Sequence, residues 1–382
     1  MAEGEDKPVT ARIGAGVASF DADAWDACAG AANPFVSHAF LSTLESSGSA
    51  TPEAGWQPIP IAIDGPDGRL AGVAPAYVKS HSQGEYVFDH SWADAWHRAG
   101  GQYYPKLQIA VPFTPVPGPR LLTDDDTIAY GLIAAAEALV ERHGLSSAHA
   151  TFLEPRDIAR FRAAGWLIRE GSQFHWSNAG YARFEDFLDS LASRKRKAVR
   201  KERATAQAGL EIVHVRGREI SEAHWSAFWR FYQDTGARKW GRPYLTRAFF
   251  SYLGEAMADR ILLVFALRDG QPIAGALNLI GEDALYGRYW GCTEEVPFLH
   301  FELCYYQAID FAIAHGLSRV EAGAQGEHKL ARGYGPVPTW SAHYIADPGF
   351  RRAVADFVQR EAEAVEHEIA FLGEMTPFKK GG

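Results

Sequence analysis

An internal duplication constrains the fold of this chain more than any other feature of its sequence. The segment "NPFVSHAFLSTL" (33–44) aligns without a gap on "RPYLTRAFFSYL" (242–253). Three further matches keep the same order along the chain: Trp25 with Trp225, "DGRLAGVAPA" (67–76) with "DGQPIAGALN" (269–278), and "ERHGLSS" (141–147) with "IAHGLSR" (313–319). Because four ordered markers are hard to obtain by chance, we predict two copies of one structural unit.

Each copy predicts the same order of helices and strands. Apolar residues at helical spacing come first, as Phe249, Phe250 and Leu253 show. Two β-rich runs then meet at Asp269-Gly270, a dipeptide that favours a tight hairpin. A further strand, a helix closed by Gly316 and a last strand complete the copy. This order predicts a mixed α/β unit that is used twice.

The length of 382 residues exceeds that of one typical domain and agrees with two copies. We expect a flexible N-terminal tail, two domains, and a C-terminal helix with its own tail. The second domain includes a basic helix, expected over residues 184–208. The expected boundaries are 1–16 for the first tail, 17–172 and 173–350 for the domains, and 351–382 for the C-terminal part.

Composition excludes several classes of protein. A hydrophobic share of 47% is ample for a buried core. No apolar run reaches the roughly 18 residues of a membrane helix, and the acidic start "MAEGEDKPVT" is not a secretory signal. Three widely spaced cysteines without a CxxC pair fit a reducing cytoplasm, and a net charge of −9 disfavours a general nucleic-acid binder. We therefore expect a cytoplasmic protein without a membrane span.

One short segment brings possible metal ligands together. The stretch "FDHSWADAWH" contains Asp89, His90, Asp94 and His97. These residues do not follow the HExxH spacing or the pattern of two histidines and one carboxylate. We expect no metal site and no tightly bound cofactor.

Several distinctive blocks resemble the FemAB-like family of N-acyltransferases, whose description is peptidoglycan biosynthesis or recognition. The blocks are "YYPKLQIAVPFTPVPGPRLL", "SRKRKAVRKER", "ARKWGRPYL", "YGRYWG", "LHFELCYYQAI" and "EAGAQGEHKLARG". The resemblance implies an α+β (mixed α/β) fold of two tandem GNAT-like domains, where GNAT denotes the acyl-CoA N-acyltransferase fold. It covers about residues 20 to 360. The long helical hairpin that some Fem enzymes insert before their second half has no counterpart of that length here.

The resemblance also implies a reaction class. Fem transferases move amino acids from aminoacyl-tRNA onto peptidoglycan precursors, so we expect transfer of an acyl or aminoacyl group onto a primary amine. Acyl-CoA enzymes of the GNAT fold place a [QR]-x-x-G-x-[GA] loop before a helix to hold the diphosphate. The corresponding junction here, "WGCTEEVPFLHFE", lacks those glycines and carries two glutamates. An aminoacyl-tRNA co-substrate is therefore favoured over acyl-CoA, which stays an alternative.

Two further possibilities stay open at this point. The acceptor is expected to be a small molecule or a peptide with an amine, and tRNA is a possible partner. A non-catalytic module that binds a cell-wall precursor or another anionic ligand would fit the same family description. The sequence does not indicate an oligomeric state.

The glycine-rich segment "EAGAQGEHKLARG" is the first candidate for a site. It follows a predicted strand, and ligands of α/β folds collect beyond the carboxyl ends of strands. The resemblance places Lys329 where Fem enzymes carry a lysine near the substrate, so we expect a catalytic role for it. Gln325, Glu327, His328 and Arg332 are expected to bind substrate. The alternative interpretation is a solvated turn.

The strand and helix of residues 286–307 supply a second set of candidates. Arg288, Tyr289 and Trp290 lie on a strand that lines the reacting centre in GNAT folds, and His300 begins the next helix. We rank Glu302 as a possible general base. The resembling blocks add four expected substrate-binding residues: Lys239, Trp240, Tyr104 and Lys106.

The basic helix is the third candidate. Seven basic residues lie between Arg194 and Arg203. Arg196, Arg200 and Arg203 would share one face of the helix and could bind the phosphates of a tRNA, a CoA or a nucleotide-linked precursor. A helix that only adds solubility is the equally weighted alternative.

Overall fold

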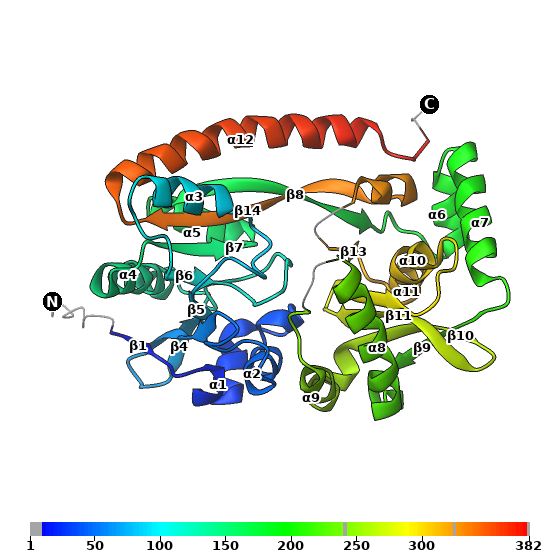
Figure 1. Ribbon diagram of the computed structural model, residues 1–382, viewed down its shortest axis with the longest axis horizontal. Helices are drawn as coiled ribbons and strands as arrows, with labels where there is room; N and C mark the ends of the chain where they lie inside the picture. Colours follow the sequence, from blue (N-terminus) through cyan, green and yellow to red (C-terminus); the bar gives the residue numbers. More distant parts are fainter. Residues whose placement is uncertain (1–9, 240–242, 324–325, 380–382) are drawn as a thin grey trace, which may run out of the picture. The chain divides into compact units, whose positions relative to one another are not determined.

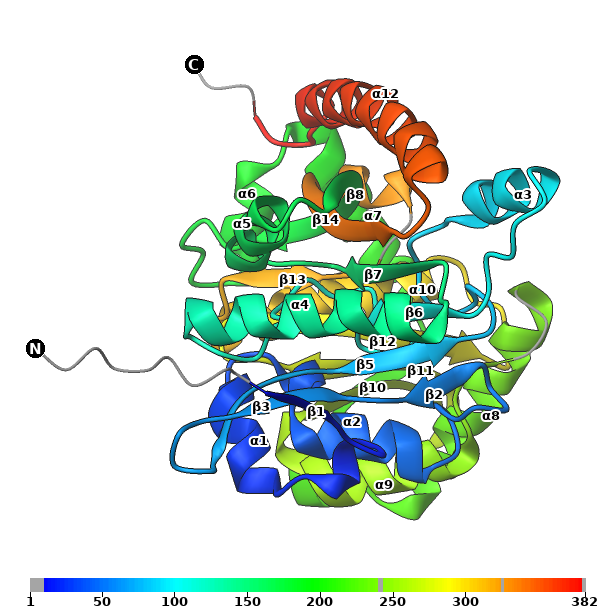
Figure 2. The same ribbon diagram turned by 90° about the vertical axis from the view of Figure 1, so that its left-hand side faces the viewer.

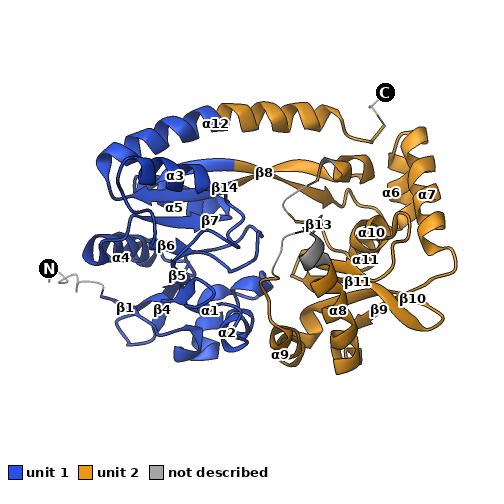
Figure 3. Ribbon diagram, in the orientation of Figure 1, with its two compact units in different colours: residues 1–170, 340–362 blue, residues 171–339, 363–382 orange. Residues whose placement is uncertain are grey.

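The computed structural model describes residues 10–239, 243–323 and 326–379 (Figure 1). Contacts divide the chain into two compact units (Figure 3). Unit 1 contains residues 1–170 and 340–362, and unit 2 contains residues 171–339 and 363–382. Residues 340–362 thus belong with the N-terminal half of the chain, whereas the sequence prediction assigned 173–350 to the second domain.

Unit 1 contains a three-stranded sheet, four further strands that belong to a second, larger sheet, and the helices that cover them. Its strands are β1 (Ala11–Ile13), β2 (Trp56–Pro58), β3 (Ile61–Asp64), β4 (Leu70–Ala74), β5 (Ala76–Lys79), β6 (Lys106–Ile109) and β7 (Ser147–Thr151). Its helices are α1 (Ala22–Ala29), α2 (His38–Ser46), α3 (His90–Arg98), α4 (Asp126–His143) and α5 (Pro155–Ala163). One sheet has the order β1-β3-β4, and the strands β2, β5, β6 and β7 follow one another in the second.

The hydrophobic core of unit 1 lies between these strands and helix α4 (Figure 2). Helix α4 presents Leu132, Ile133, Ala136 and Val140 to β3, β4 and β7, and Asp125 caps its N-terminus. The apolar residues recur three or four positions apart, as a helix with one buried face requires.

Unit 2 has one sheet with helices on both faces. Its strands are β8 (Leu167–Ser177), β9 (Glu211–Arg216), β10 (Ile261–Arg268), β11 (Gln271–Ile280), β12 (Ala284–Cys292), β13 (Arg319–Glu321) and β14 (Gly335–Ile345). Its helices are α6 (Phe184–Ser190), α7 (Ser193–Gln207), α8 (Glu222–Lys239), α9 (Arg247–Met257), α10 (Leu299–Phe301), a π-helical turn η5 (Glu302–Tyr306) and α11 (Gln307–Ala314). The strand order is β8-β13-β12-β11-β10-β9, in which only the β12–β13 pair is parallel.

The predicted duplication is visible in matching elements of the two units. Helix pairs α1–α2 and α8–α9 precede the hairpins β3–β4 and β10–β11, and the strands and helices that follow also correspond. Ser37 and Thr246, which align in the sequence, both cap a helix by accepting a hydrogen bond from the backbone N–H three residues later. The two units therefore share one order of helices and strands, as the duplication predicted.

Each unit completes its sheet with a strand that also belongs to the other unit. Strand β8 leaves unit 1, and its C-terminal half pairs with β13 of unit 2. Strand β14 leaves unit 2, and its residues 341–345 pair with β7 of unit 1. Helix α12 (Pro348–Glu374) follows β14 and begins in unit 1. This exchange explains why residues after 339 return to unit 1.

The basic segment is two helices and not the single helix expected over 184–208. Helix α6 ends at Ser190, and α7 begins at Ser193. Between them Leu191 adopts an extended conformation and forms a β-bridge with Phe378, while the N–H of Ala192 donates to the carbonyl of Pro377. This pairing with the C-terminal segment interrupts the helix.

Candidate functional site

The two parallel strands of unit 2 separate after a short stretch of pairing. Strand β12 pairs with β13 at three positions, the last of which joins Tyr286 to Glu321. Immediately beyond this point β12 contains a β-bulge, because Asn278 of β11 lies opposite Gly287 whereas Leu277 lies opposite Tyr289. Arg288 is the extra residue. A bulge bends its strand and often lies beside an active site.

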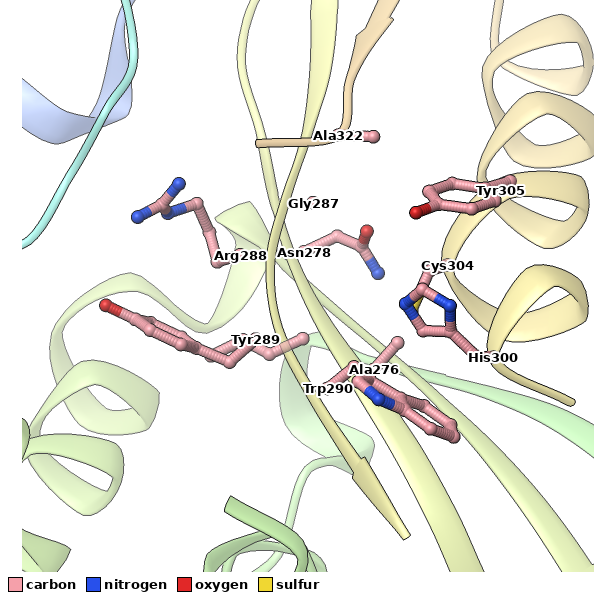
Figure 4. Close-up of a pocket in the computed structure, with 11 residues that line it drawn as sticks. Ala276, Asn278, Gly287, Arg288, Tyr289, Trp290, His300, Cys304, Tyr305 and Ala322 are labelled. Atoms are coloured by element: carbon pink, nitrogen blue, oxygen red, sulfur yellow. The ribbon is translucent and has the colours of Figure 1, made fainter. Parts of the chain in front are cut away.

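A pocket of about 150 Å³ opens where the strands separate (Figure 4). Strands β11 and β12, the helical segment after β12, and the residue after β13 form its walls. The lining residues are Ala276, Leu277, Asn278, Gly287, Arg288, Tyr289, Trp290, His300, Cys304, Tyr305 and Ala322. We call this cavity the β12 pocket.

Residues on both sides of β12 line the β12 pocket. Arg288 and Tyr289 extend to one side of β12 in Figure 4, and the ring of Tyr289 lies 5.2 Å from that of Tyr232 on α8. Trp290 extends to the other side, where its ring lies 5.0 Å from that of His300.

The corresponding place in unit 1 has a larger side chain. The sequence alignment matches Ala76 with Asn278 and Ala150 with Ala322, and Ile109 pairs with Ala76 as Gly287 pairs with Asn278. Ile109 also pairs with Ala150, whereas the pairing of β12 with β13 stops one position earlier. Ile109 is fully buried. Unit 1 thus has a buried isoleucine at the position that Gly287 holds in unit 2.

Asn278 is the most buried polar residue of the β12 pocket. Its side chain is 1% exposed, and its Nδ2 donates to the carbonyl of Leu262 at 3.4 Å. Its Oδ1 has no hydrogen-bond partner within the described part of the chain. The sequence analysis missed this residue, although a single asparagine in the apolar run "GALNLI" was a signal that could have identified it.

Glu321 ends β13 at the strand separation. It is 4% exposed; its Oε1 accepts a hydrogen bond from Arg319 Nε at 2.9 Å, and its Oε2 has no hydrogen-bond partner among the residues described. Burial raises the pKa of Glu321 to about 7, even though the charge of Arg319 opposes the shift. Because side chains alternate along a strand, Glu321 points away from the core that holds Val320.

Lys329 lies in the interior of unit 2. The solvated-turn interpretation would have required it to lie on the surface. Its side chain is 1% exposed, and its Nζ donates to the carbonyl of Gly323 at 2.8 Å. Burial lowers the pKa of Lys329 to about 8, and the electrostatic effect of Cys304 partly opposes this shift. The carbonyl that accepts from Lys329 belongs to Gly323, which directly follows Ala322 of the β12 pocket.

Comparison with known proteins identifies the family of this chain. A model of the FemAB-like family, described as peptidoglycan biosynthesis/recognition, matches residues 16–380. The chain belongs to the FemAB-like family. A search of curated proteins finds no significant match.

Solved structures confirm the fold of this FemAB-like protein. The crystal structure of FemX is 13% identical and has a TM-score of 0.56, with 88% of this chain and 98% of that chain covered. The structure of L-PGS from Bacillus licheniformis is 10% identical, with a TM-score of 0.51 and coverages of 83% and 93%. A tandem GNAT protein from the clavulanic acid biosynthesis pathway is also similar, with 12% identity, a TM-score of 0.42 and coverages of 77% and 84%.

The structure brings several of the sequence-predicted residues of the FemAB-like chain together. Arg288, Tyr289, Trp290 and His300 line the β12 pocket. His328 adjoins this group, since its Nε2 lies 2.9 Å from the hydroxyl of Tyr305. Binding of substrate by these residues stays a prediction.

Arg332 and Glu302 have internal partners. Arg332 donates to the carbonyl of His328 and to Glu202, and its guanidinium lies 3.4 Å from the centre of the Phe301 ring. The fully buried carboxylate of Glu302 accepts hydrogen bonds from Arg203, Gln207 and Gln307. A base role for Glu302 stays a prediction that would require it to release these donors.

The three arginines of the basic helix are also paired with carboxylates of unit 2. Arg196 lies 2.9 Å from Asp189, Arg200 lies 2.5 Å from Glu185, and Arg203 lies 3.0 Å from Glu302. A phosphate would have to compete with these partners. Phosphate binding here is therefore still a prediction, and the structure gives each arginine a structural role.

Tyr104 and Lys106 lie in unit 1 and not at the β12 pocket. Lys106 is fully buried, and its Nζ contacts Glu85 at 2.7 Å and also Asp89, while the hydroxyl of Tyr104 lies 2.7 Å from that of Ser82. Asp89, considered above as a metal ligand, is thus paired with a lysine. Gln325, Trp240 and the side chains of Lys239 and Glu327 lie outside the described residues.

Among the described residues, every helix is too short or too polar to cross a membrane.

Proposed function

We propose that this FemAB-like protein is an N-acyltransferase of peptidoglycan biosynthesis, which moves an acyl or aminoacyl group onto a primary amine. The observation that carries the proposal is the separation of β12 from β13, where residues on both sides of β12 line one pocket. The family description and the fold shared with FemX support it. In GNAT folds this strand lines the reacting centre.

In this proposal the acyl group and the amine bind on opposite sides of β12. The acyl group enters the β12 pocket beside His300, Cys304 and Tyr305. The amine approaches from the face of Arg288 and Tyr289. Its nitrogen attacks the acyl carbon, a C–N bond forms, and the bond from the acyl carbon to the donor breaks. Holding both reactants at one opening supplies orientation, which can contribute a large share of rate enhancement.

Two buried groups near the strand separation have the pKa values that this reaction needs. We assign to Glu321 the proton that the amine loses, because its pKa of about 7 suits a general base at neutral pH. We assign to the protonated Lys329 the stabilisation of the negative charge that develops on the acyl oxygen. Glu321 accepts a hydrogen bond from Arg319, and Lys329 donates one to the carbonyl of Gly323, so both side chains are held in place.

The donor in this proposal is an aminoacyl-tRNA. Phosphates of an acyl-CoA would lie at the N-terminus of the helix after β12, and there Glu294 and Glu295 precede Leu299. Glu294 forms an ion pair with Arg268, so only part of its negative charge acts at that place. Carboxylates there repel a diphosphate, so the alternative donor is disfavoured.

A transfer assay tests the proposal. Purified protein is incubated with a peptidoglycan precursor that carries a free amine, together with either aminoacylated tRNA or acetyl-CoA. The mass of the precursor is then measured by mass spectrometry. We expect the mass of an amino acid to be added in the first mixture. Addition of acetyl only would support acyl-CoA, and binding of the precursor with no product from either donor would support a binding module.

A further inference from the structure

Asn278 gives the β12 pocket one strong chemical preference. Its Nδ2 is held by the carbonyl of Leu262, and its Oδ1 lacks a protein partner although the side chain is 1% exposed. Figure 4 shows the amide end of Asn278 between β12 and the side chains of Cys304 and Tyr305. A buried carbonyl oxygen costs free energy unless it accepts a hydrogen bond. The pocket therefore offers one acceptor to whatever occupies it.

The fold itself does not need an asparagine at this place. Unit 1 has Ala76 at the aligned position, fully buried in an apolar core. Its pairing partner is Ile109 in unit 1, whereas the partner of Asn278 in unit 2 is Gly287. The polar residue thus occurs in the copy where a glycine lies opposite it, and an alanine opposite an isoleucine takes its place in the other copy.

The size of the pocket limits its occupant to a small group. An engineered protein cavity of about 150 Å³ holds a benzene molecule, so the β12 pocket, also about 150 Å³, has room for roughly six heavy atoms on that scale. A small acyl group with one substituent fits, and a long acyl chain does not.

We propose that Asn278 selects acyl groups that carry an N–H or O–H on the carbon next to the carbonyl, which means aminoacyl or hydroxyacyl groups and not plain alkanoyl groups. This inference rests on the proposed function in one respect, namely that the pocket receives the acyl group. The N–H or O–H donates to Asn278 Oδ1. An alkanoyl group displaces water from Oδ1 and returns no hydrogen bond, and sites that hydrogen-bond a ligand reject analogues without the donor.

Three small amides of nearly equal shape test the selection without any transfer reaction. L-Alaninamide, L-lactamide and isobutyramide differ only in an amino, a hydroxyl or a methyl group at the same carbon. Occupancy is measured as protection of Cys304 from iodoacetamide, since Cys304 lines the pocket. Peptide mass spectrometry separates its labelling from that of Cys28, which is outside the pocket and serves as the internal reference. The melting temperature with each amide gives a second readout.

We expect alaninamide and lactamide to protect Cys304 at concentrations about tenfold lower than isobutyramide, which corresponds to one hydrogen bond. In Asn278→Leu, which keeps a side chain of similar size, all three amides should protect about equally. Lactamide is uncharged, so its behaviour separates hydrogen bonding from charge.

Equal protection by the three amides of the wild-type protein would overturn the inference. A preference for alaninamide and lactamide that persists in Asn278→Leu would also overturn it, and so would an absence of protection and of any melting shift with all three. Failure of the transfer assay together with selective protection would instead remove the proposed reaction and leave the selection intact.

Discussion

At the scale of single residues, Glu321 and Lys329 predict how the rate of transfer depends on pH. A base acts in its deprotonated form, so kcat/KM should rise as pH increases through about 7, the pKa of Glu321. A cation that stabilises an oxyanion acts in its protonated form, so kcat/KM should fall as pH increases through about 8, the pKa of Lys329. We expect a narrow bell-shaped profile. Glu321→Gln should remove the acidic limb of the kcat/KM profile, and Lys329→Met should remove its alkaline limb. A profile that keeps both limbs in both variants would refute these roles.

Lys329 also shows why burial must be known before a variant is chosen. An alanine at this position would leave a cavity and deprive the Gly323 carbonyl of its donor. Methionine retains most of the volume. We expect Lys329→Met to lower kcat/KM by roughly tenfold or more, about 1.4 kcal/mol in the barrier, with a melting temperature within a few degrees of wild type. Full activity in this variant would return the loop to a structural role.

Most of the site residues that sequence reasoning missed belong to no sequence motif. They become site residues only because of how the strands pair. Gly287 and Ala322 are ordinary residues until the end of β12–β13 pairing places them at an opening. Cys304 is half-buried and lines the pocket. No spacing in the chain reveals which of two duplicated copies is open.

At the scale of secondary-structure elements, the basic helix α7 is held by ion pairs of unequal burial. Arg203 donates to the fully buried Glu302, whereas Arg200 pairs with Glu185 at an exposed position. Arg203→Gln leaves a buried carboxylate without its cation and should lower the free energy of unfolding by about 1–3 kcal/mol. Arg200→Gln is the matched control and should change it by less than about 1 kcal/mol. Urea unfolding of the two variants measures the difference, and equal stabilities would contradict a structural role for Arg203.

The limits of helix prediction are clear in the same region. The sequence indicated one helix over 184–208, and the first part of this range is helical, with Phe184, Phe187 and Leu188 buried. The break at Leu191 depends on the C-terminal residues Pro377 and Phe378, which lie far away in the sequence. A local pattern contains no information on such a contact.

At the scale of the whole chain, the duplication predicted the fold well. Ordered markers gave two GNAT-like units, and the structure and the FemAB-like family match confirm them. The exchange of β8 and β14 between the units was not predicted, because the pairing partner of a strand is not encoded in its own alternation of residues. The two copies also differ at one aligned place, where unit 2 has Gly287 opposite Asn278 and unit 1 has Ile109 opposite Ala76.

One substitution shows whether the space beside Gly287 is needed for transfer. Gly287→Ile places in unit 2 the side chain that Ile109 has in unit 1. A Cβ at Gly287 would meet its neighbours only at 3.5 Å or more, so the backbone accepts a side chain while the larger group fills the β12 pocket. We predict that transfer of the aminoacyl group falls below detection in Gly287→Ile, whereas Gly287→Ala, the matched control, retains measurable activity and both variants melt near the wild-type temperature. Wild-type transfer rates in a folded Gly287→Ile protein would contradict the account.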